Sequence, residues 1–171
     1  MKRYNIADHM ASLTQFPASD HDHHACVASA LSAAEAECRR RGARLTDIRR
    51  RVLELVWTSH APVGAYALLD GLRGEGRAAA PPTVYRALDF LLAHGLIHRI
   101  ETLNAFIGCR HPGVPHVGLF LMCRRCGTVA ELNDGAIERA VERGAERLGF
   151  RVLTLTVEAA GLCPTCERTP E

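Results

Sequence analysis

The sequence lacks any long hydrophobic run. Its 171 residues contain no stretch of roughly 18 apolar residues, the length that a helix needs to cross a bilayer. Lys2 and Arg3 are followed by polar and acidic residues, so the apolar core of a secretory signal is missing as well. With 47% hydrophobic residues, the chain still has enough apolar side chains for a packed core. We therefore expect a cytoplasmic protein with no membrane partner.

Motifs of common enzyme classes are also missing. The chain has no nucleophile elbow, no phosphate-binding glycine loop, and no His-x-Glu of the kind that zinc deaminases need. Cys163-Pro-Thr-Cys166 is similar to the Cys-Pro-x-Cys of dithiol oxidoreductases, but those proteins place the pair at the start of a helix in a βαβ unit. Only five residues follow Cys166. We therefore expect no enzymatic activity and no small-molecule substrate.

The net charge is only +2, but the charge is unevenly distributed. Residues 38 to 101 carry eleven arginines against six acidic side chains. Seven of these arginines lie between Arg39 and Arg51, and such a run suits contact with nucleic-acid phosphates. A solvated helix face would have the same composition, so both interpretations stay open.

Helical patterns predominate as far as Gly95. Residues 1–25 show no apolar periodicity and are predicted to form a mobile tail. Its His-rich segment 21–24 is either a weak metal site or, as is more common for short histidine runs in tails, incidental. Apolar spacing and helix stop signals then predict four helices in succession: from Cys26 to Gly42, from Thr46 to Ser59, within residues 63–76, and from Pro82 to Gly95.

The fourth predicted helix has one apolar face and one free face. The apolar face consists of Val84, Ala87, Leu88, Leu91 and Leu92. Thr83 and Arg86 point away from it, and Tyr85 lies near its edge. Two β-prone runs follow directly, at 96–102 and 104–109, and predict a hairpin. This order is typical of a winged helix-turn-helix that binds DNA with this helix, although a packed helical domain without DNA would look similar.

The pattern changes near residues 100 to 108. Strands are predicted on either side of the Cys123–Cys126 turn, followed by an amphipathic helix that begins after Asp134 and a strand at 150–159. The fold class is therefore α+β, with a winged-helix domain at 26–103 and a small α/β dimerisation domain at 104–171. The second domain is small enough to need a metal or a partner subunit for stability.

Four of the seven cysteines form two Cys-x-x-Cys pairs, Cys123 with Cys126 and Cys163 with Cys166. Four thiolates complete the tetrahedral ligand set of a structural zinc, and a reducing compartment disfavours disulfides. The remaining isolated candidates have no comparable ligands nearby in the sequence: Cys26, Cys38, His60 and His94. Cys38 is predicted to be a buried apolar side chain.

Further metal ligands gather where the two predicted domains meet. They are His98, Cys109, His111, His116 and Glu131. If the turn at Cys123 folds the two strands back on each other, Glu131 lies opposite residues 117–119, within reach of His116. A second metal site is one interpretation, and ordinary surface or core side chains are the other.

Three segments together resemble the ferric uptake regulator family, and most closely its zinc uptake regulator branch. They are residues 80–101, the Cys-Arg-Arg-Cys-Gly knuckle, and the terminal Cys-Pro-Thr-Cys. The resemblance runs from about Cys26 to Cys166 and implies a homodimer that represses metal-uptake genes when it is loaded with metal. It implies two zinc ions per subunit. A structural zinc would take Cys123, Cys126, Cys163 and Cys166, and a sensing zinc would take His98, Cys109, His116 and Glu131.

The resemblance also implies roles in DNA binding. Arg86 matches a base-contacting position of the family, and Tyr66 matches another contact of the zinc branch. Together with Thr83 and Tyr85 on the free side of the predicted recognition helix, they form the candidate surface for double-stranded operator DNA. Asp70 and Arg73, three residues apart, fit either a local helix pair or a contact with a neighbouring dimer.

One departure from the family bears on the choice of metal. Many iron and peroxide sensors of the family carry a dense histidine cluster ahead of the knuckle, whereas this chain keeps only His111 and His116 there. With the thiolate of Cys109, this favours zinc, because carboxylate-rich sites suit iron or manganese. We expect a zinc-responsive repressor. The alternatives are an iron or manganese sensor of the same family, or a zinc-stapled adaptor that binds protein.

Overall fold

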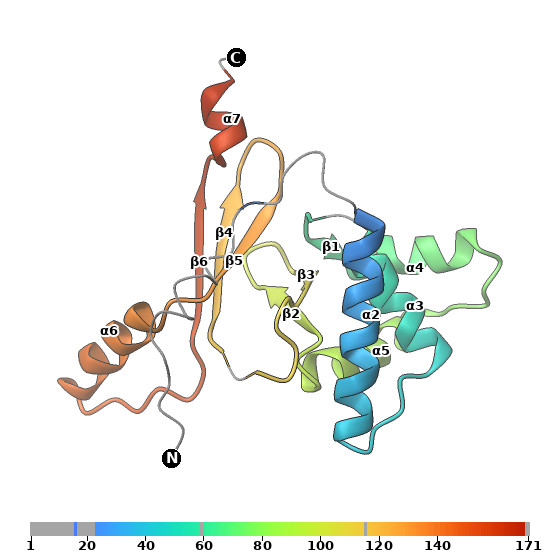
Figure 1. Ribbon diagram of the computed structural model, residues 1–171, viewed down its shortest axis with the longest axis horizontal. Helices are drawn as coiled ribbons and strands as arrows, with labels where there is room; N and C mark the ends of the chain where they lie inside the picture. Colours follow the sequence, from blue (N-terminus) through green and yellow to red (C-terminus); the bar gives the residue numbers. More distant parts are fainter. Residues whose placement is uncertain (1–15, 17–22, 59, 115, 170–171) are drawn as a thin grey trace. The chain divides into compact units, whose positions relative to one another are not determined.

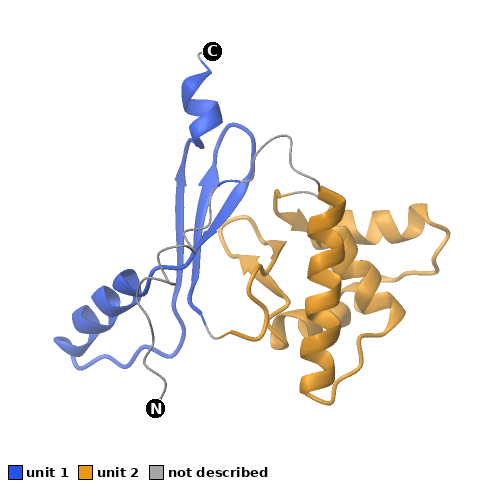
Figure 2. Ribbon diagram, in the orientation of Figure 1, with its two compact units in different colours: residues 1–17, 115–171 blue, residues 18–114 orange. Residues whose placement is uncertain are grey.

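The computed structural model describes residues 16, 23–58, 60–114 and 116–169 (Figure 1). The chain forms two compact units, which Figure 2 distinguishes by colour: unit 2 comprises residues 18–114, and unit 1 comprises residues 1–17 and 115–171. Most of the predicted tail lies outside the described residues. Among the residues that are described, no helix combines the length and apolar character needed to cross a bilayer.

Unit 2 contains the predicted helices in the predicted order. They are α2 (His23–Arg40), α3 (Asp47–Val56), α4 (Ala65–Gly74) and α5 (Pro81–Ala93). Helix α2 begins at His23 rather than at Cys26, so the tail prediction was wrong for residues 23–25. Thr46 occupies the N-cap position of α3, but its side chain makes no capping hydrogen bond. Helix α5 starts at a proline and ends before Gly95, whose φ of 63° suits a glycine.

A small antiparallel sheet follows the helices, in the order β1-β3-β2. Strands β2 (Ile97–Ile100) and β3 (Ala105–Gly108) form the predicted hairpin, with His98 opposite Ile107. The turn is residues 101–104 rather than the shorter connection expected, and Asn104 adopts a φ of 46°. Strand β1 (Val63–Gly64), which the sequence did not predict, pairs with β3. Because β3 pairs with β1 and β2, it belongs to unit 2, which extends to Val114 rather than to residue 103.

The core of unit 2 lies between the helices and this sheet. The predicted apolar face of α5 packs into it, with Val84, Ala87, Leu88 and Leu91 buried. Helices α3 and α4 contribute the other large apolar side chains: Val52, Leu53, Val56, Leu68, Leu69 and Leu72. The ring of Trp57 closes one end of this core against the backbone of Gly108, the last residue of β3.

Replacing Gly108 by alanine is expected to destabilise unit 2. A Cβ at this position would lie inside 3.0 Å of the buried Trp57 ring, and overpacking of this kind costs about 1–3 kcal/mol. Urea denaturation monitored by tryptophan fluorescence measures the change, since Trp57 is the only tryptophan. Gly74→Ala is the control, because a Cβ there meets nothing within 4 Å. Equal stability of the two variants would contradict the packing described.

Most of the arginine run pairs with side chains of unit 2. Arg40 donates to the buried Glu37 over 2.7 Å, and this hydrogen bond, with that from Arg41, lowers the pKa of Glu37 to about 2. Arg51 contacts Glu75 over 2.6 Å. Other members of the run contact acidic or aromatic side chains: Arg39 and Arg50 with Glu35, and Arg49 with Phe90. These pairings favour the structural interpretation of the run over phosphate contact.

Unit 1 is an α/β unit with a three-stranded sheet, in the order β5-β4-β6. Strands β4 (Gly118–Cys123) and β5 (Val129–Leu132) are antiparallel, and β6 (Thr156–Gly161) runs parallel to β4. Asp134 caps α6 (Gly135–Glu146) by accepting a hydrogen bond from the N–H of Ala136 at 2.8 Å. Strand β6 is shorter than predicted, because β4 begins opposite Thr156 and leaves the preceding residues without a neighbour in that ladder.

Helix α6 has an apolar stripe that the described residues leave uncovered. No residue of α6 is buried. Large apolar side chains of this helix and the segment after it remain exposed: Val141, Leu148, Phe150 and Leu153. Exposed apolar surface of this extent in a small unit is typical of a subunit interface.

Candidate metal centres and recognition surface

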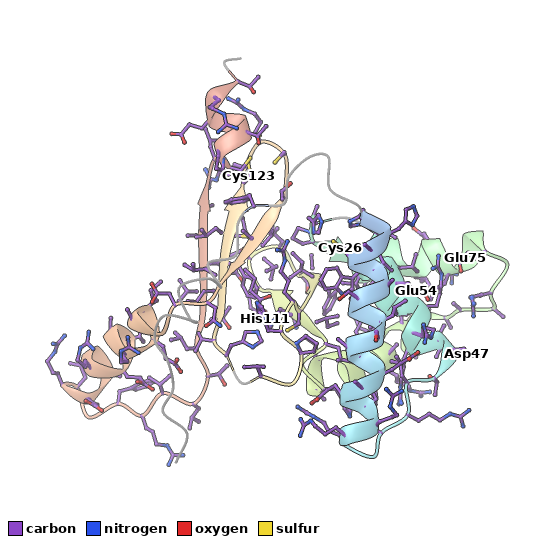
Figure 3. The ribbon with its side chains drawn as sticks, viewed as in Figure 1. Cys26, Asp47, Glu54, Glu75, His111 and Cys123 are labelled. Atoms are coloured by element: carbon purple, nitrogen blue, oxygen red, sulfur yellow. The ribbon has the colours of Figure 1, made fainter. Side chains whose placement is uncertain are left out.

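The two Cys-x-x-Cys pairs meet at one end of the sheet of unit 1, where Figure 3 labels Cys123. Cys123 ends β4, Cys126 lies in the turn that follows it, and Cys163 and Cys166 lie at the start of the short helix α7 (Pro164–Arg168). Their four Sγ atoms lie within 4.8 Å of one another. The fold therefore assembles the four-thiol cluster that the spacing predicts.

The sulfur separations fit a metal rather than a disulfide. The Sγ atoms of Cys126 and Cys163 are 3.7 Å apart, and all the cysteines are free. A disulfide requires about 2.05 Å. Four sulfurs at about 2.3 Å from a tetrahedral zinc would be separated by about 3.8 Å. The donor set and its spacing thus fit a zinc ion bound by all four thiolates.

Backbone donors around the cluster favour the thiolate form. Hydrogen bonds from the backbones of Cys126 and Cys163 lower the pKa of Cys123 to about 6. The side chain of Thr128 lowers the pKa of Cys126, whereas burial raises the pKa of Cys166 to about 12. Zinc binds the thiolate form, so the hydrogen bonds at Cys123 and Cys126 favour metal binding, whereas Cys166 must give up a tightly held proton when it binds.

A second pair of candidate ligands in unit 1 consists of His116 and Glu131. Nε2 of His116 lies 2.7 Å from Oε1 of Glu131, and both side chains are almost completely buried. Glu131 is on β5, opposite Phe120 of β4 rather than opposite residues 117–119, but the predicted contact with His116 is present. A buried carboxylate beside an imidazole is a pair of ligands that zinc accepts.

Two further ligands lie close together in unit 2. His98 is on β2, and Cys109 follows β3, with its N–H donating to the carbonyl of Leu96 over 3.1 Å. The hairpin register holds their ligand atoms within 4.8 Å of each other. Cys109 is only 2% exposed, which is ordinary for a thiol in a core but also suits a ligand shielded from water.

The free face of α5 carries the predicted DNA contacts. Arg86 and Tyr85 are exposed, while Thr83, in the first turn, is half-buried. Tyr66, near the start of α4, is 70% exposed. An arginine and two tyrosines on the surface of neighbouring helices are side chains that can reach base edges and phosphates.

The cysteines and histidines that have no ligand nearby in the sequence differ in their surroundings in the fold. Cys38 is buried in the core of unit 2, as predicted, and burial raises the pKa of its thiol. His94 lies on the ring of Phe90 and contacts its carbonyl over 2.8 Å. Cys26 and His60 do not stand alone, however, because the fold brings both together with His23. Sequence reasoning missed this cluster.

Comparison with known proteins identifies the family. The profile described as "Ferric uptake regulator family" matches residues 40–160. The chain belongs to the ferric uptake regulator family. The zinc uptake regulation protein of Escherichia coli strain K12 is 40% identical over 137 residues, which are 80% of each chain. This family consists of transcriptional regulators rather than enzymes, in agreement with the missing catalytic motifs.

Two solved structures of the ferric uptake regulator family also resemble the chain. One is a zinc uptake regulator in complex with zinc and DNA, with a TM-score of 0.78, 39% identity, and coverage of 82% of this chain and 95% of the other. The other is the crystal structure of holo XcZur, with a TM-score of 0.76, 46% identity, and coverage of 82% and 99%. The predicted α+β fold, with an N-terminal DNA-binding domain and a C-terminal dimerisation domain, is confirmed.

Proposed function

We propose that the protein is a zinc-responsive repressor that binds operator DNA as a zinc-loaded homodimer and shuts down zinc-uptake genes. The similarity to a zinc uptake regulator in complex with zinc and DNA carries this proposal. The chemistry of the chain agrees, because its candidate sensing ligands include a thiolate, Cys109, which suits zinc better than iron or manganese. A regulator of this kind acts where the DNA is, in the cytoplasm.

In this proposal, each subunit holds two zinc ions with different roles. Cys123, Cys126, Cys163 and Cys166 hold the structural ion, which uses all four positions of a tetrahedral set and leaves none for exchange. Their position at the end of a small sheet supports this role, since a unit of this size needs a cross-link or a partner for stability.

The sensing ion would take its ligands from both units. His98 and Cys109 contribute from the hairpin of unit 2, and His116 and Glu131 contribute from unit 1. Each pair of ligands supports this separately. The ligand atoms of His98 and Cys109 are within 4.8 Å of each other, and those of His116 and Glu131 are 2.7 Å apart. When bound, zinc would supply a link between the two units.

This link provides a physical route from zinc to DNA. Fixing the two units in one arrangement would space the two α5 helices of a dimer for successive major grooves, about 34 Å apart. The coupling free energy is the difference in the free energy of zinc binding between the two arrangements of the units, and it is expected to be about 1–3 kcal/mol. Because coupling is reciprocal, operator DNA must tighten zinc binding by the same factor.

The exposed apolar stripe of unit 1 supports the homodimer. Val141, Leu148 and Phe150 lie on or just after α6 and are exposed among the described residues, so a second chain could cover them. A two-fold dimer would use the same stripe on both subunits.

Arg86→Ala is expected to reduce operator affinity more than affinity for random DNA. Arg86 is exposed on the free face of α5, and base contacts specify sequence whereas phosphate contacts do not. Loss of one good base contact reduces discrimination by about 1–3 kcal/mol. Fluorescence anisotropy with zinc-loaded protein measures the affinity of the variant for both DNAs. The operator is selected beforehand from a random library.

The matched control for this substitution is Arg143→Ala. Arg143 is an exposed arginine of α6 in unit 1, so its removal makes the same change in net charge away from α5. The control should retain discrimination between the two DNAs. An equal loss of affinity on both DNAs in Arg86→Ala would count against a base-contacting role.

The alternatives differ in measurable ways. A protein-binding adaptor would show no steep dependence of duplex-DNA binding on salt, whereas a DNA-binding dimer releases counterions and loses affinity as salt rises. An iron or manganese sensor of the same family would bind operator DNA with those metals and not with zinc.

A further inference from the structure

A third cluster of metal ligands lies within unit 2. Three side chains form it: His23, Cys26 and His60. His23 and Cys26 are one turn apart in the first two turns of α2, and His60 belongs to the connection between α3 and β1. Figure 3 labels Cys26 near that end of α2. None of the three belongs to either of the zinc sites proposed above.

The geometry of this cluster fits a small cation. One ligand atom of each side chain lies within 4.8 Å of the others. The rings of His23 and His60 meet edge to face, with centroids 4.8 Å apart. Zinc bonds of about 2.0–2.1 Å to nitrogen and 2.3 Å to sulfur in a tetrahedron separate the ligand atoms by about 3.3–3.6 Å.

The surroundings of the cluster also suit metal binding. All three side chains are half-buried, and Cys26 packs against the core of unit 2. Partial burial reduces competition from water while leaving a path for an ion to enter. Two imidazoles and a thiolate are a borderline-soft donor set, of the kind that selects zinc over magnesium or calcium.

We infer that His23, Cys26 and His60 form a third, weaker zinc site. Three protein ligands leave the fourth tetrahedral position to water, so the site holds its ion less tightly than the four-cysteine cluster and fills only when free zinc is abundant. Zinc bound there would fasten the beginning of α2 to the connection that leads through β1 into α4, the helix that carries Tyr66. High zinc would therefore stabilise the DNA-binding unit itself, independently of any link between the units.

Cobalt titration of the full-length, zinc-loaded protein tests the inference. With the tighter sites filled by zinc, added Co²⁺ should occupy the third site and give the ligand-field bands of a tetrahedral ion, together with a thiolate-to-cobalt charge-transfer band. Calorimetry with Zn²⁺ should give one further equivalent per subunit beyond those already bound. Absence of both signals from the wild-type protein would overturn the proposal.

Three variants assign the signals to these residues. Cys26→Ser should lose the charge-transfer band, and His60→Gln should weaken binding by at least about tenfold, since even loss of a residue that only supports a ligand costs 10- to 100-fold. His24→Ala is the matched control, because His24 is the exposed neighbour of His23 on the same helix and should have no effect. Circular dichroism confirms that each variant is folded. A band that persists in Cys26→Ser, or disappears in His24→Ala, would contradict the assignment.

Discussion

Cys123→Ser is expected to unfold unit 1 and abolish dimerisation. Cys123 is buried at the end of β4, and loss of its thiolate leaves three sulfurs where four complete the zinc site. Structural zinc contributes about 10–16 kcal/mol in small zinc-dependent folds, whereas the net stability of a domain is about 5–15 kcal/mol. Circular dichroism measures the unfolding, gel filtration the loss of the dimer, and zinc analysis of the purified variant the loss of the bound ion.

Arg124→Ala is the control for this substitution. Arg124 is exposed in the same turn, and its backbone N–H, which donates to the carbonyl of Gly161 over 2.8 Å, is retained in alanine. We expect the control to be a folded dimer with full zinc content. A Cys123→Ser protein with the same fold and dimer as the control would show that the four-cysteine cluster does not hold unit 1 together.

Cys109→Ser is expected to leave a folded dimer that no longer responds to zinc. The hydroxyl of serine is a poor zinc ligand, while the backbone hydrogen bond from residue 109 to Leu96 remains. Operator affinity in the presence of zinc should fall by about 5- to 150-fold, the range that corresponds to a coupling free energy of 1–3 kcal/mol. Anisotropy titrations with and without zinc measure the change.

Cys38→Ser provides a matched control, because Cys38 and Cys109 are both 2% exposed and both lie in unit 2. The control removes a buried thiol that is not a proposed ligand, so it should lower stability while keeping the zinc response. Loss of the zinc response in both variants would mean that damage to the core of unit 2, rather than loss of a ligand, explains the effect.

Periodic apolar patterns predicted the main elements correctly. The wheel of α5 placed Val84, Ala87, Leu88 and Leu91 on the buried face because the core of unit 2 covers one side of that helix. The contact between His116 and Glu131 was also predicted, because folding about a short turn brings β5 back along β4 whatever the surrounding structure. Features of this kind depend on local spacing, which a sequence displays directly.

Features that depend on tertiary packing were missed. Strand β1 has two residues, too few for a period, and forms only because β3 is beside it. Strand β3 pairs on both edges and so belongs to unit 2, which ends at Val114, and spacing alone does not reveal this pairing. His60 meets Cys26 only once α2 packs beside the end of α3, so neither residue has a visible partner in the sequence.

The most direct test of the account measures zinc content and DNA binding together. Purified protein, dialysed free of excess zinc, is analysed before and after mild chelation, and each sample is titrated with operator DNA. We predict two zinc ions per subunit, of which one is removed easily together with operator binding, while the other remains on the four cysteines. A single tightly held zinc, with DNA binding unaffected by the chelator, would contradict a sensing site on His98, Cys109, His116 and Glu131.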